Sequence, residues 1–314
     1  MEVKMRNIEI KGYATVLPTK ILDFKGQTRY RCNEGETQLS MAVEAANKAL
    51  KSAGLGIEDI DCIVSTSAVQ VQPIPSTSAL IHEEIAKGTS IPALDINTTC
   101  TSFVTALDTI SYLIHAGRYS NVLLVASEQG SLGLNPKQKE SYELFSDGAA
   151  AVVISKTDDL TKGIIHSVQK TWSEGVHDTE IRGGLTNIHP SLYTEKTKEE
   201  YMFDMNGKKV LLLFARKFPT MIQEYFEESN MKIEDIDMFV PHQASRALDL
   251  IMSNVKIPKN KYINYISEYG NMVSVSIPFM LCKALDEGKI KKGDTIILMG
   301  TAAGLTANIL TMKI

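Results

Sequence analysis

The sequence contains little of what several large functional classes need. Its four cysteines lie far apart, at positions 32, 62, 100 and 282, and none belongs to a CxxC pair or a Cys/His ligand spacing. This scatter indicates neither a disulfide framework nor a zinc site. The net charge of −4 disfavours nucleic acid as a partner, because phosphate contacts need clustered basic residues.

Long apolar runs are also lacking. The first six residues lead into no apolar segment of the kind found in signal peptides, and no apolar run approaches the ~18 residues of a transmembrane helix. With 44% hydrophobic and 22% charged residues, the composition is that of an ordinary globular protein. We therefore expect a cytoplasmic protein with no membrane partner, whose 314 residues suit two domains or one large α/β domain.

An internal repeat is what the sequence does contain. Residues 57–64 (IEDIDCIV) recur as residues 233–240 (IEDIDMFV), identical at six of eight positions and offset by 176 residues. Farther along, Gly117 and Gly288 precede matching apolar strands at an offset of 171 residues, and this offset carries Cys100 onto Asn271. The repeat predicts an α/β protein with two related halves, placed at residues 1–160 and 161–314.

Cys100 lies where a β-like stretch changes into a helix. A polar segment ends in this cysteine, and apolar side chains then recur at helical spacing from Phe103 to Ile114. At the start of a helix, free backbone NH groups and the helix dipole lower the pKa of a thiol and make its thiolate available as a nucleophile. The alternative is that Cys100 is a small buried hydrophobic residue, as free cysteines commonly are.

His242 and Asn271 occupy comparable places in the second half. His242 follows the repeated strand and Pro241, at the carboxyl edge where open α/β sheets build their sites. A purely structural histidine is the alternative. Asn271 stands in a polar turn before an apolar helix. Together with Cys100, these two residues form a set suited to acyl transfer.

Three other segments have a distinct composition. Residues 149–154 (AAAVVI) combine small residues with a strand pattern, which indicates a close subunit or domain contact. The polar residues 23–36 are expected to form a surface loop, and residues 171–202 a loop or flap. The flap carries His177 and His189, which we expect to be solvated.

Five short motifs follow one another in a fixed order: Cys100 before Phe103, Phe145-Ser146-Asp147-Gly148-Ala149, Pro241-His242-Gln243-Ala244, Tyr269-Gly270-Asn271 before Ser276-Ile277-Pro278, and Gly304-Leu305-Thr306. In this order they resemble the β-ketoacyl-acyl-carrier-protein synthase III enzymes of the thiolase superfamily. The resemblance covers nearly the whole chain. It implies a thiolase-like fold in which two duplicated α/β halves form a layered αβαβα architecture.

The resemblance also implies a role for each matched catalytic residue. Cys100 is similar to the nucleophile that accepts the acyl group, and His242 with Asn271 to the pair that binds a malonyl thioester carbonyl. Gly304 matches the position whose backbone NH joins that of Cys100 in an oxyanion hole. Two such donors stabilise the negative charge that builds on oxygen when a thiolate attacks a thioester.

An acyl pocket is implied as well. Ile74, in the loop of residues 73–76, matches a residue from one subunit that closes the end of the other subunit's acyl pocket. Thr98 and Thr99, where the family has small residues, are expected to narrow that pocket. A β-branched side chain at position 74 is stiff about χ1, so the pocket should suit short or medium acyl groups.

The implied activity is a decarboxylative Claisen condensation of an acyl thioester primer with malonyl-acyl carrier protein, in fatty-acid initiation or a related specialised pathway of lipid metabolism. The implied partners are acyl carrier protein, an acyl-CoA or other acyl thioester, and a second copy of the chain in a homodimer. Coenzyme A or carrier-protein thioesters are substrates, and neither a cofactor nor a metal is implied.

The chain departs from the family pattern in several places. Residues 301–303 (TAA) replace a glycine-rich run, and Arg246 comes one position early after the histidine motif. The loop of residues 23–36 lacks the tryptophan that stacks on the adenine of coenzyme A, and Phe24 or Tyr30 could take its place. Two alternatives stay open: a non-decarboxylating acyltransferase or hydroxymethylglutaryl-type synthase of the same superfamily, and a non-catalytic homologue that binds acyl carriers.

Overall fold

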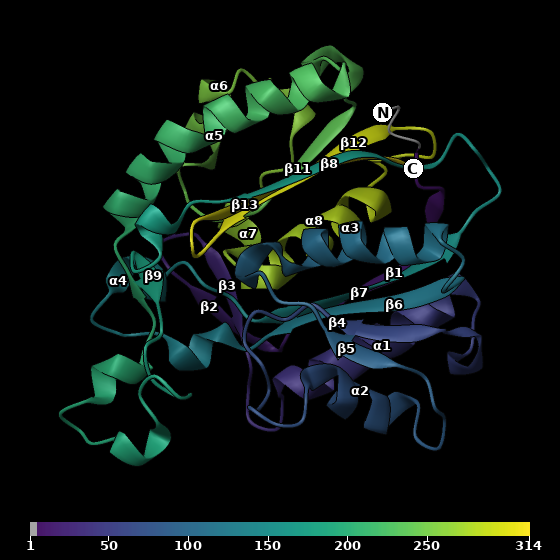
Figure 1. Cartoon of the computed structure of the whole chain (residues 1–314). Coiled ribbons are helices and arrows are strands. Elements are labelled where there is room, and N and C mark those ends of the chain that lie inside the picture. Colours follow the sequence, from purple (N-terminus) through teal and green to yellow (C-terminus); the bar gives the residue numbers. More distant parts are fainter. Residues whose placement is uncertain (1–4) are drawn as a thin grey trace.

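Two β-sheets, one from each half of the chain, run through the protein, whose structure is a computed structural model that describes residues 5–314 (Figure 1). The first has the strand order β1-β7-β6-β4-β5: Ile8–Val16, Gly148–Lys156, Asn121–Glu128, Cys62–Ser65 and Ala93–Asp95. The second has the order β8-β13-β12-β11: Gly163–Thr171, Thr306–Lys313, Thr295–Ala302 and Met238–Pro241. The expected absence of a signal segment concerns residues 1–4, which lie outside the described residues.

The two sheets repeat one pattern of pairing. β1, β7 and β6 are antiparallel neighbours and β4 joins β6 in parallel, just as β8, β13 and β12 are antiparallel and β11 joins β12 in parallel. Only the first sheet continues, through the short parallel edge strand β5. The strands change from one sheet to the other between Lys156 and Gly163.

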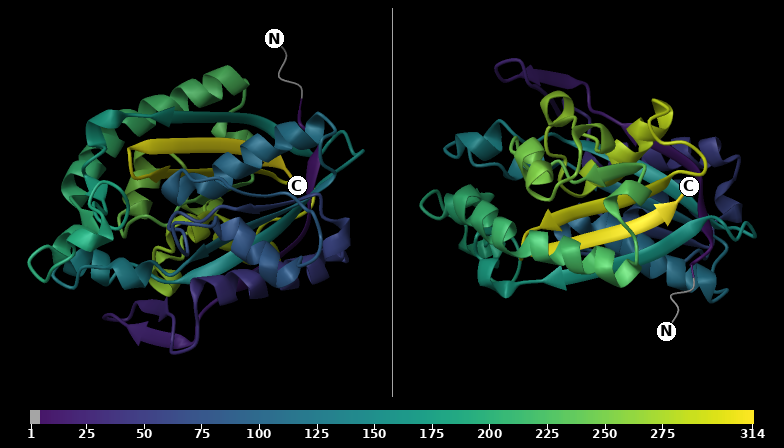
Figure 2. Two further views of the ribbon diagram at one scale, coloured as in Figure 1. Left: turned by 60° about the horizontal axis from the view of Figure 1, so that its bottom comes forward. Right: turned by 90° about the horizontal axis from the view of Figure 1, so that it is seen from above.

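Six helices complete the layers, as the views of Figures 1 and 2 show. α3 (Ser102–His115) and α8 (Ser276–Asp286) lie between the sheets, where they contact strands of both. α1 (Gln38–Ala53) and α2 (Thr77–Ile85) cover the outer face of the first sheet, and α5 (Gly207–Ser229) and α6 (Leu248–Asn254) that of the second. The predicted αβαβα architecture is confirmed.

Burial on both faces explains why the central strands are almost wholly apolar. In β6 every residue from Val122 to Glu128 is buried, because α1 packs on one face of the sheet and α3 on the other. Helix boundaries follow local signals. The side chain of Thr37 accepts the NH of Ser40 at 3.0 Å and caps α1, and Gly54 ends that helix at a φ of 68°.

Shorter elements connect these layers. They are the hairpin β2 (Lys20–Asp23) and β3 (Thr28–Arg31), the pair β9 (Thr179–Glu180) and β10 (Asp204–Met205), and the one-turn helices α4 (Lys139–Tyr142) and α7 (Ile266–Tyr269). Irregular chain dominates residues 171–202, as expected for a flap. Within residues 5–314, no helix has both the length and the hydrophobicity needed to span a membrane.

One expectation from the sequence is wrong, and a second holds in only one of its two alternatives. Residues 23–36 are not simply a surface loop, because they contain β3 and the fully buried Arg29. Residues 149–154 lie in the interior strand β7 between β1 and β6 and are buried throughout, so they do not form a surface for a second subunit. Their small side chains allow α1 to pack on one face of the strand and α8, from the second half of the chain, on the other, which is the expected contact between the halves.

Candidate active site

Cys100 stands in a tight turn at the start of α3. The turn is a short 3₁₀ segment, Thr99–Thr101, and Thr99 adopts a left-handed φ of 53°. Two side chains hold it: Asn97 Oδ1 accepts the NH of Thr99 at 2.8 Å, and Ser102 Oγ accepts the NH of Thr98 at 3.0 Å. The predicted change from strand to helix at Cys100 is confirmed, and the turn fixes the cysteine where the helix begins.

The second half of the chain contains the same turn before α8. Val273 has a φ of 52°, Asn271 Oδ1 accepts the NH of Val273 at 2.8 Å, and Ser276 Oγ accepts the NH of Met272 at 3.0 Å. Superposing these hydrogen bonds on those of the first turn gives an offset of 174 residues. Ser274, not Asn271, is therefore the internal counterpart of Cys100.

The offset of 171 residues inferred from the sequence was wrong at this point because the two central helices differ in length. α3 has 14 residues and α8 has 11, so the repeat loses three residues between the start and the end of these helices. The counterpart of Asn271 is Asn97, which is exposed. Asn271 itself is buried beside Cys100's turn, and the two 3₁₀ segments contact each other.

Asn271 is held firmly through its backbone. Its NH donates to the carbonyl of Leu144 and its carbonyl accepts the NH of Ser146, both at 2.9 Å. The preceding Gly270 has a φ of 69°, and a Cβ there would lie 2.4 Å from the Leu144 oxygen. Because Asn271 Oδ1 accepts a backbone NH, the other side-chain atom must be the amide nitrogen, which stays available as a donor.

His242 directly follows β11, the last residue of which pairs with Met299. Its NH donates to the Met299 carbonyl at 2.8 Å, and the ring is almost fully buried. Burial lowers the pKa of the imidazole to about 4, so the ring is neutral at pH 7. Nδ1 has no hydrogen-bond partner among the described residues. A neutral imidazole offers one NH donor without carrying charge.

Gly300 of β12 brings His242 and the turn of Cys100 together. A Cβ at this position would lie 2.7 Å from His242 Cβ and 3.5 Å from Thr101 Cγ2. The absent side chain therefore makes the space in which the histidine and the residue after Cys100 approach each other. Through this contact and the contact between the two 3₁₀ segments, the structure brings the three predicted catalytic residues to one place.

The electrostatics of Cys100 differ from the expectation. Its pKa is raised to about 12, first by burial and then by the nearby carboxylate of Glu128. The backbone NH groups of Cys100 and Ala303 oppose this rise by hydrogen bonding to the sulfur. The predicted lowering of the pKa was wrong because loss of water and a like charge outweigh the donors at the helix start. Burial also raises the pKa of Cys62 and Cys282.

Glu128 is a buried residue of the site that the sequence analysis missed. One carboxylate oxygen accepts the NH of Ala68 and the hydroxyl of Ser274, both at 2.5 Å, and the other accepts the NH of Val69 at 3.3 Å. Burial raises its pKa to about 7. The available signal was an acidic residue ending the apolar strand β6, a position at which charge is costly unless it is paired.

The turn between β12 and β13 supplies a further backbone donor. The NH of Ala303 reaches the sulfur of Cys100, and Ala303 was not among the residues predicted from the sequence. The next residue, Gly304, has a φ of 137°, which strongly favours glycine. The predicted oxyanion-hole role of Gly304 stays a prediction, and Ala303 is the donor that the geometry places beside Cys100.

Arg29 supports the turn of Asn271 from behind. Its Nε donates to the Glu143 carbonyl at 2.9 Å and one terminal nitrogen to the Ser267 carbonyl at 3.2 Å. The side chain lies so close to Gly270 that a Cβ there would be 2.6 Å from Arg29 Cδ. The buried Arg29 thus has a structural role at the site. Its position in the polar residues 23–36 does not reveal this role.

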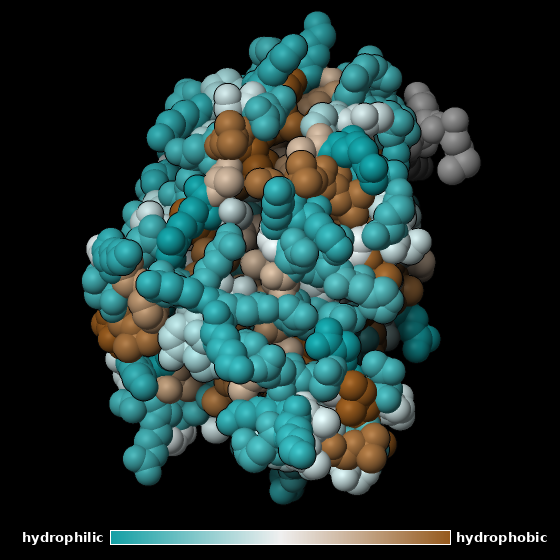
Figure 3. Space-filling model, turned by 90° about the vertical axis from the view of Figure 1, so that its left-hand side faces the viewer, coloured by the Kyte–Doolittle hydropathy of each residue, from teal (hydrophilic) through white to brown (hydrophobic). Residues whose placement is uncertain are grey.

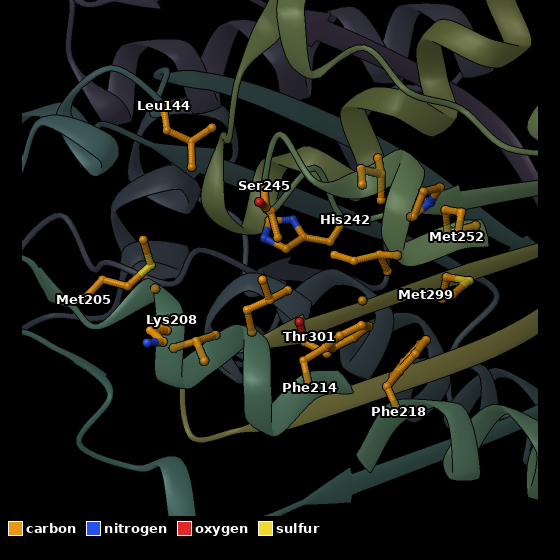
Figure 4. A pocket seen from close by; sticks show the side chains of 18 of the residues that line it. Leu144, Met205, Lys208, Phe214, Phe218, His242, Ser245, Met252, Met299 and Thr301 are labelled. Atoms are coloured by element: carbon orange, nitrogen blue, oxygen red, sulfur yellow. The ribbon is translucent and has the colours of Figure 1, made fainter. Parts of the chain in front are cut away.

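A cavity of about 370 Å³ opens beside His242 (Figure 4). It lies between α5, α6 and β12, and its wall includes Leu144, whose carbonyl binds Asn271, and Gly300, which adjoins Thr101. Cys100 and Asn271 do not line the cavity, but Asn271 bonds to Leu144 of its wall, and Thr101, which follows Cys100, adjoins Gly300 of its wall.

The three residues predicted to form an acyl pocket do not line this cavity. Ile74 is 85% exposed on its loop. The hydroxyl of Thr98 bonds to that of Thr105 at 2.7 Å, and Thr105 in turn accepts Asn308 Nδ2 at 2.7 Å. The hydroxyl of Thr99 is buried without a partner among the described residues. The role of all three in an acyl pocket stays a prediction, and that of Ile74 requires a second subunit.

Among residues 5–314, no group of three or more His, Cys, Asp or Glu side chains is placed to hold a metal ion. His177 is exposed, and its Nδ1 lies 2.9 Å from Glu180. His189 is exposed as well and caps the short turn that follows it. Neither contacts the site around Cys100.

Comparisons with known proteins identify the family of the chain. Residues 94–173 match the family described as 3-oxoacyl-acyl-carrier-protein (ACP) synthase III, and residues 226–314 match its C-terminal counterpart. These two matched segments contain Cys100, His242 and Asn271.

The face of the protein that carries the flap is mainly hydrophilic with separate hydrophobic patches (Figure 3).

Whole-chain relatives are similar over most of their length. The β-ketoacyl-(acyl-carrier-protein) synthase III of Clostridium perfringens is 35% identical over 280 residues, which cover 89% of this chain and 85% of that protein. That of Staphylococcus aureus strain Newman is 28% identical over 326 aligned positions, which cover 98% of this chain and 99% of that protein.

Solved structures share the fold. 3-Oxoacyl-(acyl-carrier-protein) synthase III from Aquifex aeolicus superposes with a TM-score of 0.86 at 26% identity, over 98% of this chain and all of that one. A single-residue variant of OleA from Xanthomonas campestris, at 19% identity and a TM-score of 0.87 with both chains fully covered, shares the fold alone. The chain thus belongs to the β-ketoacyl-(acyl-carrier-protein) synthase III family and is an acyltransferase.

Proposed function

We propose that the protein condenses an acyl thioester primer with malonyl-acyl carrier protein, with loss of CO₂, through an acyl group held on Cys100. The observation that carries this proposal is the close approach of His242 to the turn of Cys100 across Gly300. A neutral histidine and a free asparagine amide beside a cysteine can stabilise an enolate without carrying charge themselves.

In the first step the sulfur of Cys100 attacks the carbonyl carbon of the primer. Because burial keeps the thiol protonated at neutral pH, its proton leaves during this step and passes to the departing carrier thiol. The NH groups of Cys100 and Ala303 donate to the carbonyl oxygen while it is negative, and each such donor contributes on the order of 3 kcal/mol. We place Gly304 in the same oxyanion hole as a further prediction.

In the second step a malonyl thioester binds with its carbonyl oxygen between His242 and Asn271. The bond from the α carbon to the carboxylate breaks, CO₂ leaves, and the electron pair forms an enolate that both side chains stabilise. The α carbon then attacks the acyl group on Cys100. The sulfur departs and takes up a proton, which returns the enzyme to its starting state.

The carrier protein and coenzyme A are proposed as alternative carriers of the primer. Lys208 is exposed beside the cavity and Arg246 follows Ser245 of its wall, so both can attract a phosphate-bearing arm. Tyr30 stacks on Tyr269 with the ring centres 5.9 Å apart, and Phe24 packs edge-on against Tyr142 with the ring centres 6.3 Å apart. Because each ring already contacts another aromatic side chain, less of its surface is left for adenine, which favours the carrier protein as donor.

We also propose a cytoplasmic homodimer. The exposed edge of β5 offers unpaired backbone groups at which a second copy can extend the first sheet. Ile74 stands exposed on the loop before α2, the position from which it would reach a partner's acyl pocket. Sedimentation at micromolar concentration should give about twice the mass of the chain, and a stable monomer of 34.6 kDa would contradict the dimer.

A condensation assay tests the proposed reaction. The protein is incubated with acetyl, butyryl and octanoyl thioesters and with malonyl-acyl carrier protein, and both 3-oxoacyl product and CO₂ are measured. We expect equal amounts of the two products. Condensation without release of CO₂ would favour the hydroxymethylglutaryl-type alternative, and absence of both products would favour a binding protein.

A further inference from the structure

The cavity beside His242 has two ends of different character (Figure 4). The outer end is near Lys208, which is exposed, and Glu140. The inner end is lined by Phe218, Met252 and Met299, which are buried and carry only hydrocarbon or thioether groups. His242 lies between the two ends. The cavity therefore continues past the histidine into an apolar interior.

Helical periodicity builds the wall of the cavity, including its inner end. On α5, residues 207, 210, 211, 214 and 218 line the cavity, and on α6 residues 248, 251 and 252 do so. These spacings place each set on one face of its helix. Phe214 and Phe218 stack with their ring centres 4.6 Å apart and form a continuous wall.

The proposed condensation does not need this inner end. A malonyl thioester reaches His242 from the outer end, and its small acyl group ends at the histidine. His242 lines the cavity and Cys100 does not, so the inner end adjoins the group that holds the malonyl carbonyl and not the acylated sulfur. Unfilled apolar space lowers stability, and such cavities stay dry and accept apolar ligands.

We propose that the inner end binds an alkyl chain on the α carbon of the malonyl thioester, so that the enzyme condenses alkylmalonyl thioesters. This proposal rests on the proposed function and names the class of its nucleophilic substrate. The thioester carbonyl binds at His242, the carrier arm leads to the outer end, and the α substituent lies past the histidine.

The reaction is balanced in the same way as with malonate. The bond from the α carbon to the carboxylate breaks and CO₂ leaves with no change of oxidation state at the acyl carbon. The substituted enolate carbon bonds to the acyl carbon on Cys100, and the cysteine sulfur is released. The product is a 2-alkyl-3-oxoacyl thioester.

The size of the inner end sets the length of the chain. Phe214 and Phe218 are one helical turn apart, about 6 Å along the helix axis. With carbon–carbon bonds of about 1.5 Å, that distance accommodates about four carbon atoms. Each buried methylene should raise kcat/KM about fourfold until the chain reaches the end wall.

The test compares malonyl, ethylmalonyl, butylmalonyl and octylmalonyl thioesters of acyl carrier protein, with one short primer already loaded on Cys100. We expect kcat/KM to rise from malonyl to butylmalonyl and to fall again for octylmalonyl. Malonyl as the best substrate of the series would overturn the proposal. In that case normal malonyl condensation would still leave the proposed function intact.

Variants locate the site. Ile251→Phe should fill the inner end and lower the preference for butylmalonyl over malonyl at least tenfold. Leu250→Phe is the matched control, because residue 250 lies on the same helix but is 61% exposed, and its preference should equal that of the wild type. Thermal unfolding of both variants shows whether they fold. If Ile251→Phe fails to fold, Met299→Phe takes its place.

The same variants separate the two possible sources of an alkyl chain. With malonyl as extender, a series of primers from acetyl to decanoyl is loaded on Cys100, and the rates of the wild type and Ile251→Phe are compared. We expect the same chain-length profile for both. A loss of long primers only in Ile251→Phe would show that the inner end holds the primer and would overturn the proposal.

Discussion

Ser274, the internal counterpart of Cys100, donates its hydroxyl to Glu128 Oε1 at 2.5 Å. The same carboxylate raises the pKa of the Cys100 thiol. Glu128 therefore links the turn that carries Asn271 to the turn that carries the nucleophile. The two related turns thus hold different residues. The buried carboxyl group of Glu128 contacts the turn that carries Asn271 and raises the pKa of the cysteine in the other turn.

The first prediction concerns the reactivity of Cys100. Glu128→Gln removes the negative charge, lowers the pKa of the thiol and should speed alkylation of Cys100 by iodoacetamide at pH 8 several-fold. Peptide mapping after timed labelling measures the rate. Glu44→Gln, at an exposed position on α1, is the control and should label like the wild type. An unchanged or slower rate in Glu128→Gln would show that the carboxylate does not act on the thiol.

The second prediction uses the pH dependence of stability. The folded-state pKa of Glu128 is raised to about 7. Its stabilising contribution to the free energy of unfolding is therefore present below the unfolded pKa of about 4.5 and is lost as the pH rises through 7. The folded-state pKa of His242 is lowered to about 4. Its stabilising contribution to the free energy of unfolding is therefore present above the unfolded pKa of about 6.5 and is lost as the pH falls through 4. The two effects oppose each other between pH 4.5 and 6.5.

Variants should separate these opposing effects. Relative to the wild type, Glu128→Gln should gain about 2 kcal/mol in free energy of unfolding between pH 5 and pH 7, and His242→Gln should lose about 2 kcal/mol. Urea unfolding at the two pH values gives both numbers. Changes of the same sign in the two variants would contradict the assigned pKa shifts.

Much of this arrangement could be predicted from the sequence because its signals are local. The cap at Thr37, the left-handed Gly54 and the periodicity after Cys100 depend on neighbouring residues, and the structure places α1 and α3 accordingly. His242 at the carboxyl end of β11 was equally visible, because it follows the repeated strand.

The remaining features depend on residues far apart in the chain. Glu128 meets Ala68 and Ser274, 60 and 146 positions away, and Arg29 meets Ser267, 238 positions away. No local pattern reveals such partners. The pKa of Cys100 was misjudged for the same reason, because the helix start is a local feature while burial and the charge of Glu128 are not. The offset to Asn271 failed because α8 is three residues shorter than α3.

The third prediction concerns Gly300. Gly300→Ala places a methyl group 2.7 Å from His242 Cβ, so the imidazole must move by several tenths of an ångström. Condensation should fall roughly 10- to 100-fold, while acylation of Cys100 continues. Gly133→Ala is the control, because a Cβ there meets its nearest neighbour at 3.6 Å. Equal loss of acylation and condensation would mean that Gly300 does not act through the histidine.

The fourth prediction concerns Ile74. If this exposed side chain closes a partner's acyl pocket, Ile74→Ala should shift the preference several-fold toward longer primers. Initial rates with a series of saturated acyl thioesters measure the shift, and Leu132→Ala, also at an exposed position, provides the control. An unchanged chain-length profile would remove Ile74 from the pocket.

The central claim is that Cys100 carries the acyl group, and the mass of the intact protein tests it most directly. After incubation with an acyl-acyl carrier protein, the wild type, His242→Ala and Asn271→Ala should each gain the mass of one acyl group, because the two donors serve the later step. Cys100→Ala should gain none, and digestion should place the adduct on Cys100. An adduct on another residue, or an adduct that persists in Cys100→Ala, would contradict this account.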